Sequence, residues 1–133
     1  MRSCAIVLAA LLTTSSVVAS AGAESRPTGR YCGKLVSSGL LVDAETTFST
    51  DEDGRVFGSY QFRDGDAVTD GRLQEIGRDS GRTKSLRWTD KYGNGRLVII
   101  FDPSFAQFDG HWGASDAVPD HRWVGQRCQE PNS

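Results

Sequence analysis

Hydrophobic and polar residues alternate in short segments along most of the chain. In residues 55–62, for example, Val56, Tyr60 and Phe62 fall on one face of an extended strand, whereas Ser59 falls on the other. A period of two residues is typical of strands with one buried face. No segment shows a helical period sustained over several turns, so the pattern predicts an all-β protein.

Turn signals separate these segments. Asp-Gly and Asn-Gly pairs tolerate the positive φ angles that tight hairpin turns require, and they recur along the chain. They are Asp53-Gly54, Asp64-Gly65, Asp70-Gly71, Asn94-Gly95 and Asp109-Gly110. Between them we predict about eight strands. These cover residues 29–36, 45–50, 55–62, 68–76, 83–89, 96–101, 107–112 and 122–128. Residues 38–44 fit either a bend or an extension of the second strand.

The pattern also predicts which individual side chains are buried and which are exposed. Residues 96–101 (RLVIIF) are apolar on both faces, which indicates a central or doubly covered strand. Trp88 shares a face with Leu86, so we expect it in the core. Tyr92 and Phe105 flank predicted turns, and we expect both to be exposed. For Phe105 the reason is the preceding Asp-Pro-Ser, because proline ends regular strand pairing.

Successive strands joined by tight turns form an antiparallel meander. Such a meander can close into a small up-and-down barrel, which removes both exposed edges. A two-sheet sandwich is the alternative. The Gly-x-aromatic pattern at residues 58–60 (GSY) and 110–112 (GHW) resembles streptavidin-like and other small calycin barrels in texture, without a diagnostic motif of those families. Glycines within strands are typical of the bends and close packing that tight curvature needs.

Two cysteines lie near the ends of the predicted domain, Cys32 in the first strand and Cys128 in the last. Neither belongs to a Cys-x-x-Cys pair, and neither has a neighbouring histidine. Two exported thiols most simply form one disulfide. The first and last strands of a meander become neighbours when the barrel closes, and a disulfide requires a Cα–Cα distance of about 6 Å. The pairing therefore favours closure over an open sheet.

The N-terminus predicts export. Arg2 precedes a short apolar run at residues 5–12, and small residues follow. This pattern predicts that residues 1–23 are a secretory signal peptide, cleaved after Ala21 or Ala23. The apolar run is shorter than the roughly 20 residues that span a bilayer, so a retained N-terminal anchor is the weaker interpretation. We expect a secreted or periplasmic protein.

Charge limits the possible partners of the remaining single domain, residues 24–133. Removing Arg2 from 15 basic residues leaves 14 against 17 acidic ones, a formal net charge of −3. Both signs are spread along the chain, whereas a nucleic-acid groove or an anionic-membrane patch needs clustered positive charge. We expect a monomer with no nucleic-acid partner and no stable membrane insertion. The bias of arginine over lysine fits a protein of the bacterial envelope or secreted fraction.

The segment 109–121 combines both histidines of the chain with three aspartates. These residues are Asp109, His111, Asp116, Asp120 and His121. Imidazole and carboxylate groups are ordinary metal ligands, but this spacing fits no known ligand pattern. An exposed loop explains the same residues. The chain also has no Gly-x-Ser-x-Gly elbow, so we assign no catalytic residue, metal or cofactor.

We therefore expect a non-catalytic binding or interaction module whose partner is a small molecule, a glycan or a protein. Irregular loops on a rigid scaffold concentrate binding residues, which points to residues 102–123. The predicted binding residues are Phe105, His111, Trp112, Asp116 and His121. One alternative is a protein inhibitor of a secreted enzyme, which exposed apolar residues on a loop would favour. Another is a small hydrolase using residues 109–121, which a convergent His/Asp cluster would favour. An open interior lined by tryptophans would favour a small ligand.

Overall fold

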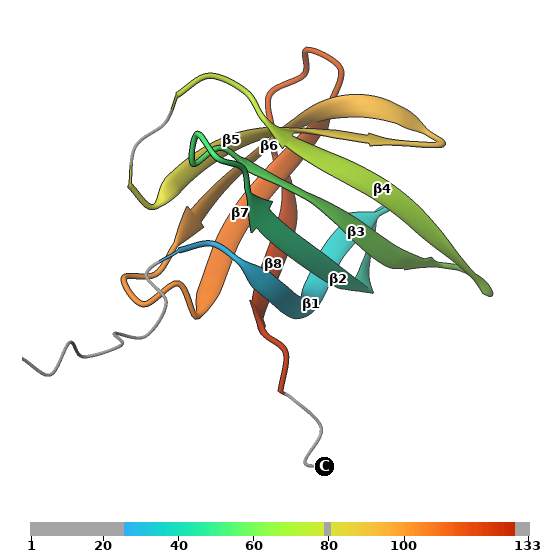
Figure 1. Ribbon diagram of the computed structural model, residues 1–133. Coiled ribbons are helices and arrows are strands. Elements are labelled where there is room, and N and C mark those ends of the chain that lie inside the picture. The colour runs from blue at the N-terminus through green and yellow to red at the C-terminus, as the bar shows by residue number, and fades with distance from the viewer. Residues whose placement is uncertain (1–25, 79–80, 130–133) are drawn as a thin grey trace, which may run out of the picture.

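The computed structural model describes residues 26–78 and 81–129, which form eight antiparallel strands and no helix (Figure 1). The strands are β1 (Gly29–Ser37), β2 (Leu40–Thr50), β3 (Val56–Asp64), β4 (Ala67–Glu75), β5 (Thr83–Asp90), β6 (Gly93–Phe101), β7 (Gln107–Ala114) and β8 (His121–Arg127). The all-β prediction is confirmed. Within the described ranges, no helix has the length and apolar character needed to cross a bilayer. The predicted signal peptide lies outside the described residues.

The strands form a closed barrel in which each pairs with its neighbours in sequence. Closure occurs between β1 and β8, whose register runs from Tyr31 opposite Arg127 to Leu35 opposite Trp123. The barrel is therefore the correct architecture rather than the sandwich. Residues 38–44, for which the sequence left two possibilities, contain a tight turn followed by an extension of β2 that starts at Leu40.

The disulfide between Cys32 and Cys128 is confirmed, with a Cα–Cα distance of 4.9 Å. It connects β1 with the residue directly after β8, next to the strand pair that closes the barrel. Such a bond indicates an oxidising, non-cytoplasmic environment.

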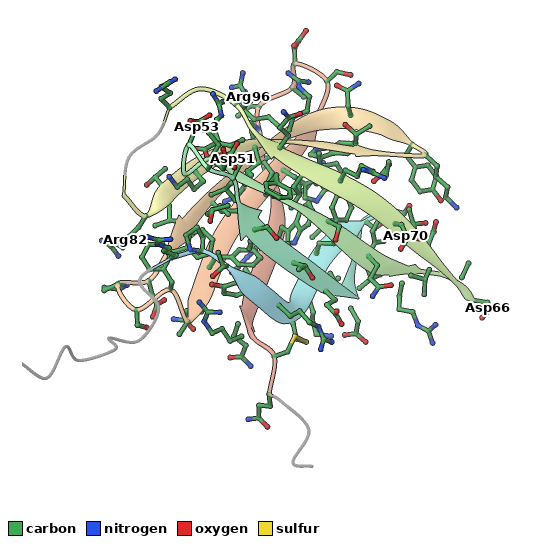
Figure 2. The ribbon with its side chains drawn as sticks, in the orientation of Figure 1. Asp51, Asp53, Asp66, Asp70, Arg82 and Arg96 are labelled. Atoms are coloured by element: carbon green, nitrogen blue, oxygen red, sulfur yellow. A yellow bond between two sulfur atoms is a disulfide. The ribbon has the colours of Figure 1, made fainter. Side chains whose placement is uncertain are left out.

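The barrel has two distinct ends. At one end, which we call the mouth, lie the β1–β2, β3–β4, β5–β6 and β7–β8 connections. At the other end, the floor, lie the remaining three connections, the start of β1 and the end of β8. Figure 2 makes the separation visible, because Asp66 marks the tip of the β3–β4 hairpin while Asp51 and Asp53 mark the far end of β3.

An aromatic cluster fills the barrel near the floor. Its rings contact one another at centroid distances of 5.2–5.9 Å. The cluster consists of Tyr31, Phe48, Phe101, Phe105 and Phe108. Edge-to-face and tilted contacts of this kind add to the stabilisation from burial alone. Aromatic side chains therefore occupy this end of the interior.

The expected exposure of Phe105 is wrong, because its side chain is only 8% exposed. Proline does end the strand as predicted, but the turn then folds back over the floor. Asp102 Oδ1 accepts hydrogen bonds from the backbone N–H groups of Ala106 (2.7 Å) and Gln107 (3.1 Å). Phe105 takes a left-handed φ of 56°, and its carbonyl accepts a hydrogen bond from the Tyr31 hydroxyl (2.6 Å). The side chain is thereby directed inward.

The apolar strand β6 is central, as the first of the two expected alternatives has it, because it pairs with β5 and β7; it is not covered on both faces. Leu97, Ile99 and Phe101 are fully buried inside the barrel, whereas Ile100 on the outer face is 55% exposed. A closed barrel gives every strand two pairing neighbours without a second layer over its outer face. Tyr92 is exposed and Trp88 is buried, as expected.

Three of the five Asp-Gly and Asn-Gly pairs lie inside strands, two of them within the predicted strands 68–76 and 107–112. Asp53-Gly54 and Asp64-Gly65 do form turns, but Gly71, Gly95 and Gly110 belong to β4, β6 and β7. Their function is to admit close neighbours. A Cβ on Gly71 would lie 2.0 Å from Cζ of Tyr60, the residue opposite on β3. The aromatic ring therefore packs directly on the glycine backbone, which no larger residue permits.

Candidate ligand-binding site

A cavity of about 200 Å³ lies inside the barrel at the mouth. Most of its lining residues are aromatic. They are Leu35, Ser37, Ser38, Tyr60, Phe62, Trp88, Asp90, Tyr92, Trp112 and Trp123. Larger depressions of about 780 Å³ also occur, but they lie along the outer faces of strands and are lined largely by exposed residues. The mouth cavity is the site with the concave, mostly apolar form of a small-molecule pocket.

The meander explains why these residues meet. In an up-and-down barrel, the ends of all odd-numbered strands lie at the same end as the starts of the even-numbered ones. Phe62, Trp88 and Trp112 each lie close to the end of an odd strand, and Trp123 lies near the start of β8. Their shared inward orientation follows from the two-residue period. Residues far apart in sequence thus surround one cavity.

The three indole N–H groups are all used to hold the rings in place. Each donates a hydrogen bond within the protein: Trp88 to the Gly113 carbonyl (3.0 Å), Trp112 to the Val36 carbonyl (3.0 Å) and Trp123 to Thr46 Oγ1 (3.1 Å). Buried tryptophan normally finds such a partner. Because the N–H groups are occupied, the indoles offer a ligand their aromatic surfaces rather than hydrogen-bond donors.

Ring-on-ring contacts further fix the cavity wall. Trp88 and Trp112 pack edge to face at 5.4 Å with an interplanar angle of 85°. Tyr60 and Trp123 pack in the same way at 4.7 Å and 72°. Aromatic pairs prefer this geometry because the positive edge of one ring meets the negative face of the other. The wall is therefore preorganised without a ligand.

Asp90 supplies the charged group of the lining. Its Oδ2 accepts a hydrogen bond from the Tyr60 hydroxyl (2.7 Å), and its Oδ1 accepts one from the backbone N–H of Tyr92 (2.8 Å). Burial, reinforced by the hydrogen bond to Asp90, raises the pKa of Tyr60 well above its usual value. Tyr60 therefore stays protonated and keeps donating to the carboxylate.

A second carboxylate group, Asp64, lies at the rim outside the lining. It accepts hydrogen bonds from the hydroxyls of Tyr92 and Thr69. Lys91 Nζ lies 3.4 Å from it. The hydrogen bond from Tyr92 is the main cause that lowers the pKa of Asp64, followed by the one from Thr69. Asp64 thus has a cationic partner in Lys91, whereas the ion pairs of the described residues do not include the Asp90 carboxylate inside the cavity.

The structure brings together only part of the predicted binding set. Trp112 lines the cavity. The centroid of the His121 ring lies 4.5 Å from that of the Trp112 ring. His111 is exposed on the outer face of β7, and Asp116 is exposed in the β7–β8 connection. Phe105 lies at the floor, in the aromatic cluster at the opposite end of the barrel. A single site containing all five residues does not exist.

Residues 109–121 do not converge on a common point. Asp109 faces outward and lies 3.5 Å from Arg122, whereas His121 lies 3.4 Å from the neighbouring Asp120. In residues 26–78 and 81–129, the one group of three metal-ligating side chains within 4.8 Å consists of Cys32, Cys128 and Glu45. Both of those cysteines are in the disulfide.

Sequence reasoning missed the polar members of the lining. Ser37, Ser38 and Asp90 lie at or next to turns, where such residues are common for conformational reasons alone. The available signal was positional, since a meander places the ends of all odd strands together. Aromatic residues near those ends, including Tyr60 and Trp88, could have been grouped by that rule.

Comparison with known protein families finds no matching family model, and comparison with curated proteins finds no significant match.

Proposed function

We propose that this chain is an exported, non-catalytic binding protein that holds a small molecule in the aromatic mouth of its barrel. The observation that carries the proposal is the contrast between the two ends of the interior. Aromatic side chains fill the floor, whereas the mouth retains a cavity of about 200 Å³ between rings that are held in fixed positions. A barrel whose tryptophans served only as core would be expected to close that space.

The cavity volume limits the size of the ligand. Pockets for drug-sized molecules measure about 300–1,000 Å³. An apolar protein cavity of about 150 Å³ accommodates benzene. The mouth, at about 200 Å³, therefore fits a single ring with a short substituent or a compact branched group.

Fragment binding followed by NMR tests this proposal. We expect compact fragments, drawn from cationic, neutral and anionic sets, to shift the indole N–H signals of Trp88, Trp112 and Trp123. Trp112→Ala should weaken binding at least tenfold, because it removes one wall of the cavity. Phe57→Ala is the matched control, since it removes an aromatic ring that is 45% exposed on the outer face of β3. A complete absence of indole shifts across the panel would contradict the proposal.

A second candidate function is inhibition of a secreted enzyme, as an exposed apolar rim favours protein contact. Leu40, at the β1–β2 turn, is 68% exposed, and Val118, in the β7–β8 connection, is 80% exposed. This candidate predicts inhibition of at least one protease in a panel of secreted serine and cysteine proteases. It also predicts loss of that inhibition in a Leu40→Asp/Val118→Asp variant that still binds fragments. Absence of inhibition by the native protein would remove the candidate.

A further inference from the structure

The charge and hydrogen-bonding capacity of the mouth select among small ligands. We propose that the mouth binds a small organic cation, in particular a compact methylated or quaternary ammonium group. This inference rests on the proposed function and specifies the chemistry of its ligand.

The cavity lining carries negative charge and no positive charge. Among its ten lining residues, Asp90 is acidic and none is lysine, arginine or histidine. The ion pairs within residues 26–78 and 81–129 do not include Asp90. The neighbouring Lys91 points to the rim, where it pairs with Asp64. The Asp90 carboxylate thus faces the cavity without a neutralising cation, a charge that a bound cation would compensate.

The lining has few donors to offer an anion. The three indole N–H groups and the hydroxyls of Tyr60 and Tyr92 all donate to protein acceptors. In the described part of the chain, this leaves the hydroxyls of Ser37 and Ser38 as the lining side-chain donors with no acceptor of their own. Moving an anion out of water without compensating donors is strongly unfavourable, and Asp90 would repel it as well.

The same shortage of polar groups argues against a sugar as the preferred ligand. A sugar ring carries several hydroxyls, and each needs a hydrogen-bond partner once it leaves water. A methylated ammonium group does not have this requirement, because its surface consists of methyl groups that carry part of the positive charge. Such a group is compact enough for a cavity of about 200 Å³.

The aromatic wall is suited to such a group. Cations are attracted to the faces of aromatic rings, most strongly to tryptophan, and aromatic cages recognise quaternary ammonium ligands in this way. Trp88, Trp112 and Trp123 line the cavity together with Tyr60. Their fixed orientation removes much of the conformational cost of binding. Rings and carboxylate together therefore form a preorganised cage for a cation.

Three ligands of nearly the same shape provide the test. Choline carries a trimethylammonium head. In 3,3-dimethylbutan-1-ol a carbon replaces the nitrogen, and 3,3-dimethylbutanoate is the corresponding anion. Calorimetric titrations at constant ionic strength should give a dissociation constant for choline at least tenfold below that of the alcohol. The anion should bind most weakly.

Two isosteric substitutions locate the effect. Asp90→Asn should reduce choline affinity at least tenfold while changing affinity for the alcohol little, because it removes the charge and keeps the shape. Asp70→Asn is the matched control and should leave both affinities unchanged. Asp70 lies on β4 (Figure 2), next to the residue opposite Asp90, but its side chain is exposed on the outer face.

The possible outcomes separate this inference from the proposed function. Equal affinity for choline and the alcohol would overturn the cation inference and leave a neutral-ligand site. Choline binding that is equally insensitive to both substitutions would overturn it as well. If no member of the trio binds but other fragments shift the indole signals, the inference fails and the proposed function stands. If no fragment shifts them, both fail.

Discussion

Phe105→Ala is expected to destabilise the protein by about 3 kcal/mol, at the lower end of the range for phenylalanine in a core. The substitution removes a ring that closes the floor of the barrel. The centroid of this ring lies 5.2 Å from that of the Phe101 ring. Chemical denaturation of the purified variant measures the change. Phe57→Ala, at an exposed position, should cost less than about 1 kcal/mol and serves as the control.

The sequence places Phe105 among exposed binding residues, and joint replacement of Phe105, His111 and His121 by alanine would on that interpretation abolish binding while leaving the fold intact. A core role and a binding role for Phe105 can be distinguished, because its ring lies at the floor, away from the mouth cavity. A Phe105→Ala protein as stable as the wild type, with altered fragment binding at the mouth, would show that the placement at the floor is wrong.

Reduction of the disulfide is expected to lower the free energy of unfolding by about 2–4 kcal/mol. Cys32 and Cys128 are separated by 96 positions. The bond therefore closes a loop that contains nearly all of the barrel, and the entropic gain rises with loop length. Denaturation curves recorded with and without reductant measure the difference.

A Cys32→Ser/Cys128→Ser protein provides the control for this experiment. Its stability should match that of the reduced wild type and should not respond to reductant. Alkylation of Cys32 and Cys128 in protein purified without reductant would refute the assigned pairing.

The order of the strands could be predicted from sequence because the two-residue period is strong and the connections are short. Errors arose where glycine had more than one explanation. Asn94-Gly95 suggested a hairpin turn, so β6 was expected to start at Arg96 rather than Gly93. The turn instead involves Lys91 and Tyr92, and Gly95 makes room for Trp88 and the Gly113 carbonyl. A local pattern cannot distinguish these two reasons for a glycine.

The candidate binding site was less accessible to sequence reasoning than the fold. Phe48 and Phe62 both point inward on neighbouring strands, but Phe48 lies near the floor end of β2 and Phe62 near the mouth end of β3. Strand order accounts for that placement. Which end of the interior keeps a cavity depends instead on how side chains from several strands share the volume, and no single segment encodes this. The choice of residues 102–123 relied on loop irregularity, and it located Trp112 and His121 near the mouth but not Tyr60 or Asp90.

The placement of the tryptophans also has a consequence for optical measurements. All three tryptophans of the chain line the mouth, and none belongs to the floor cluster. Emission excited selectively from indole therefore reports on one end of the barrel alone. Loosening of the mouth would change the emission before backbone circular dichroism registers any loss of strands. Coincident transitions by the two methods would show that the two ends unfold as one cooperative unit.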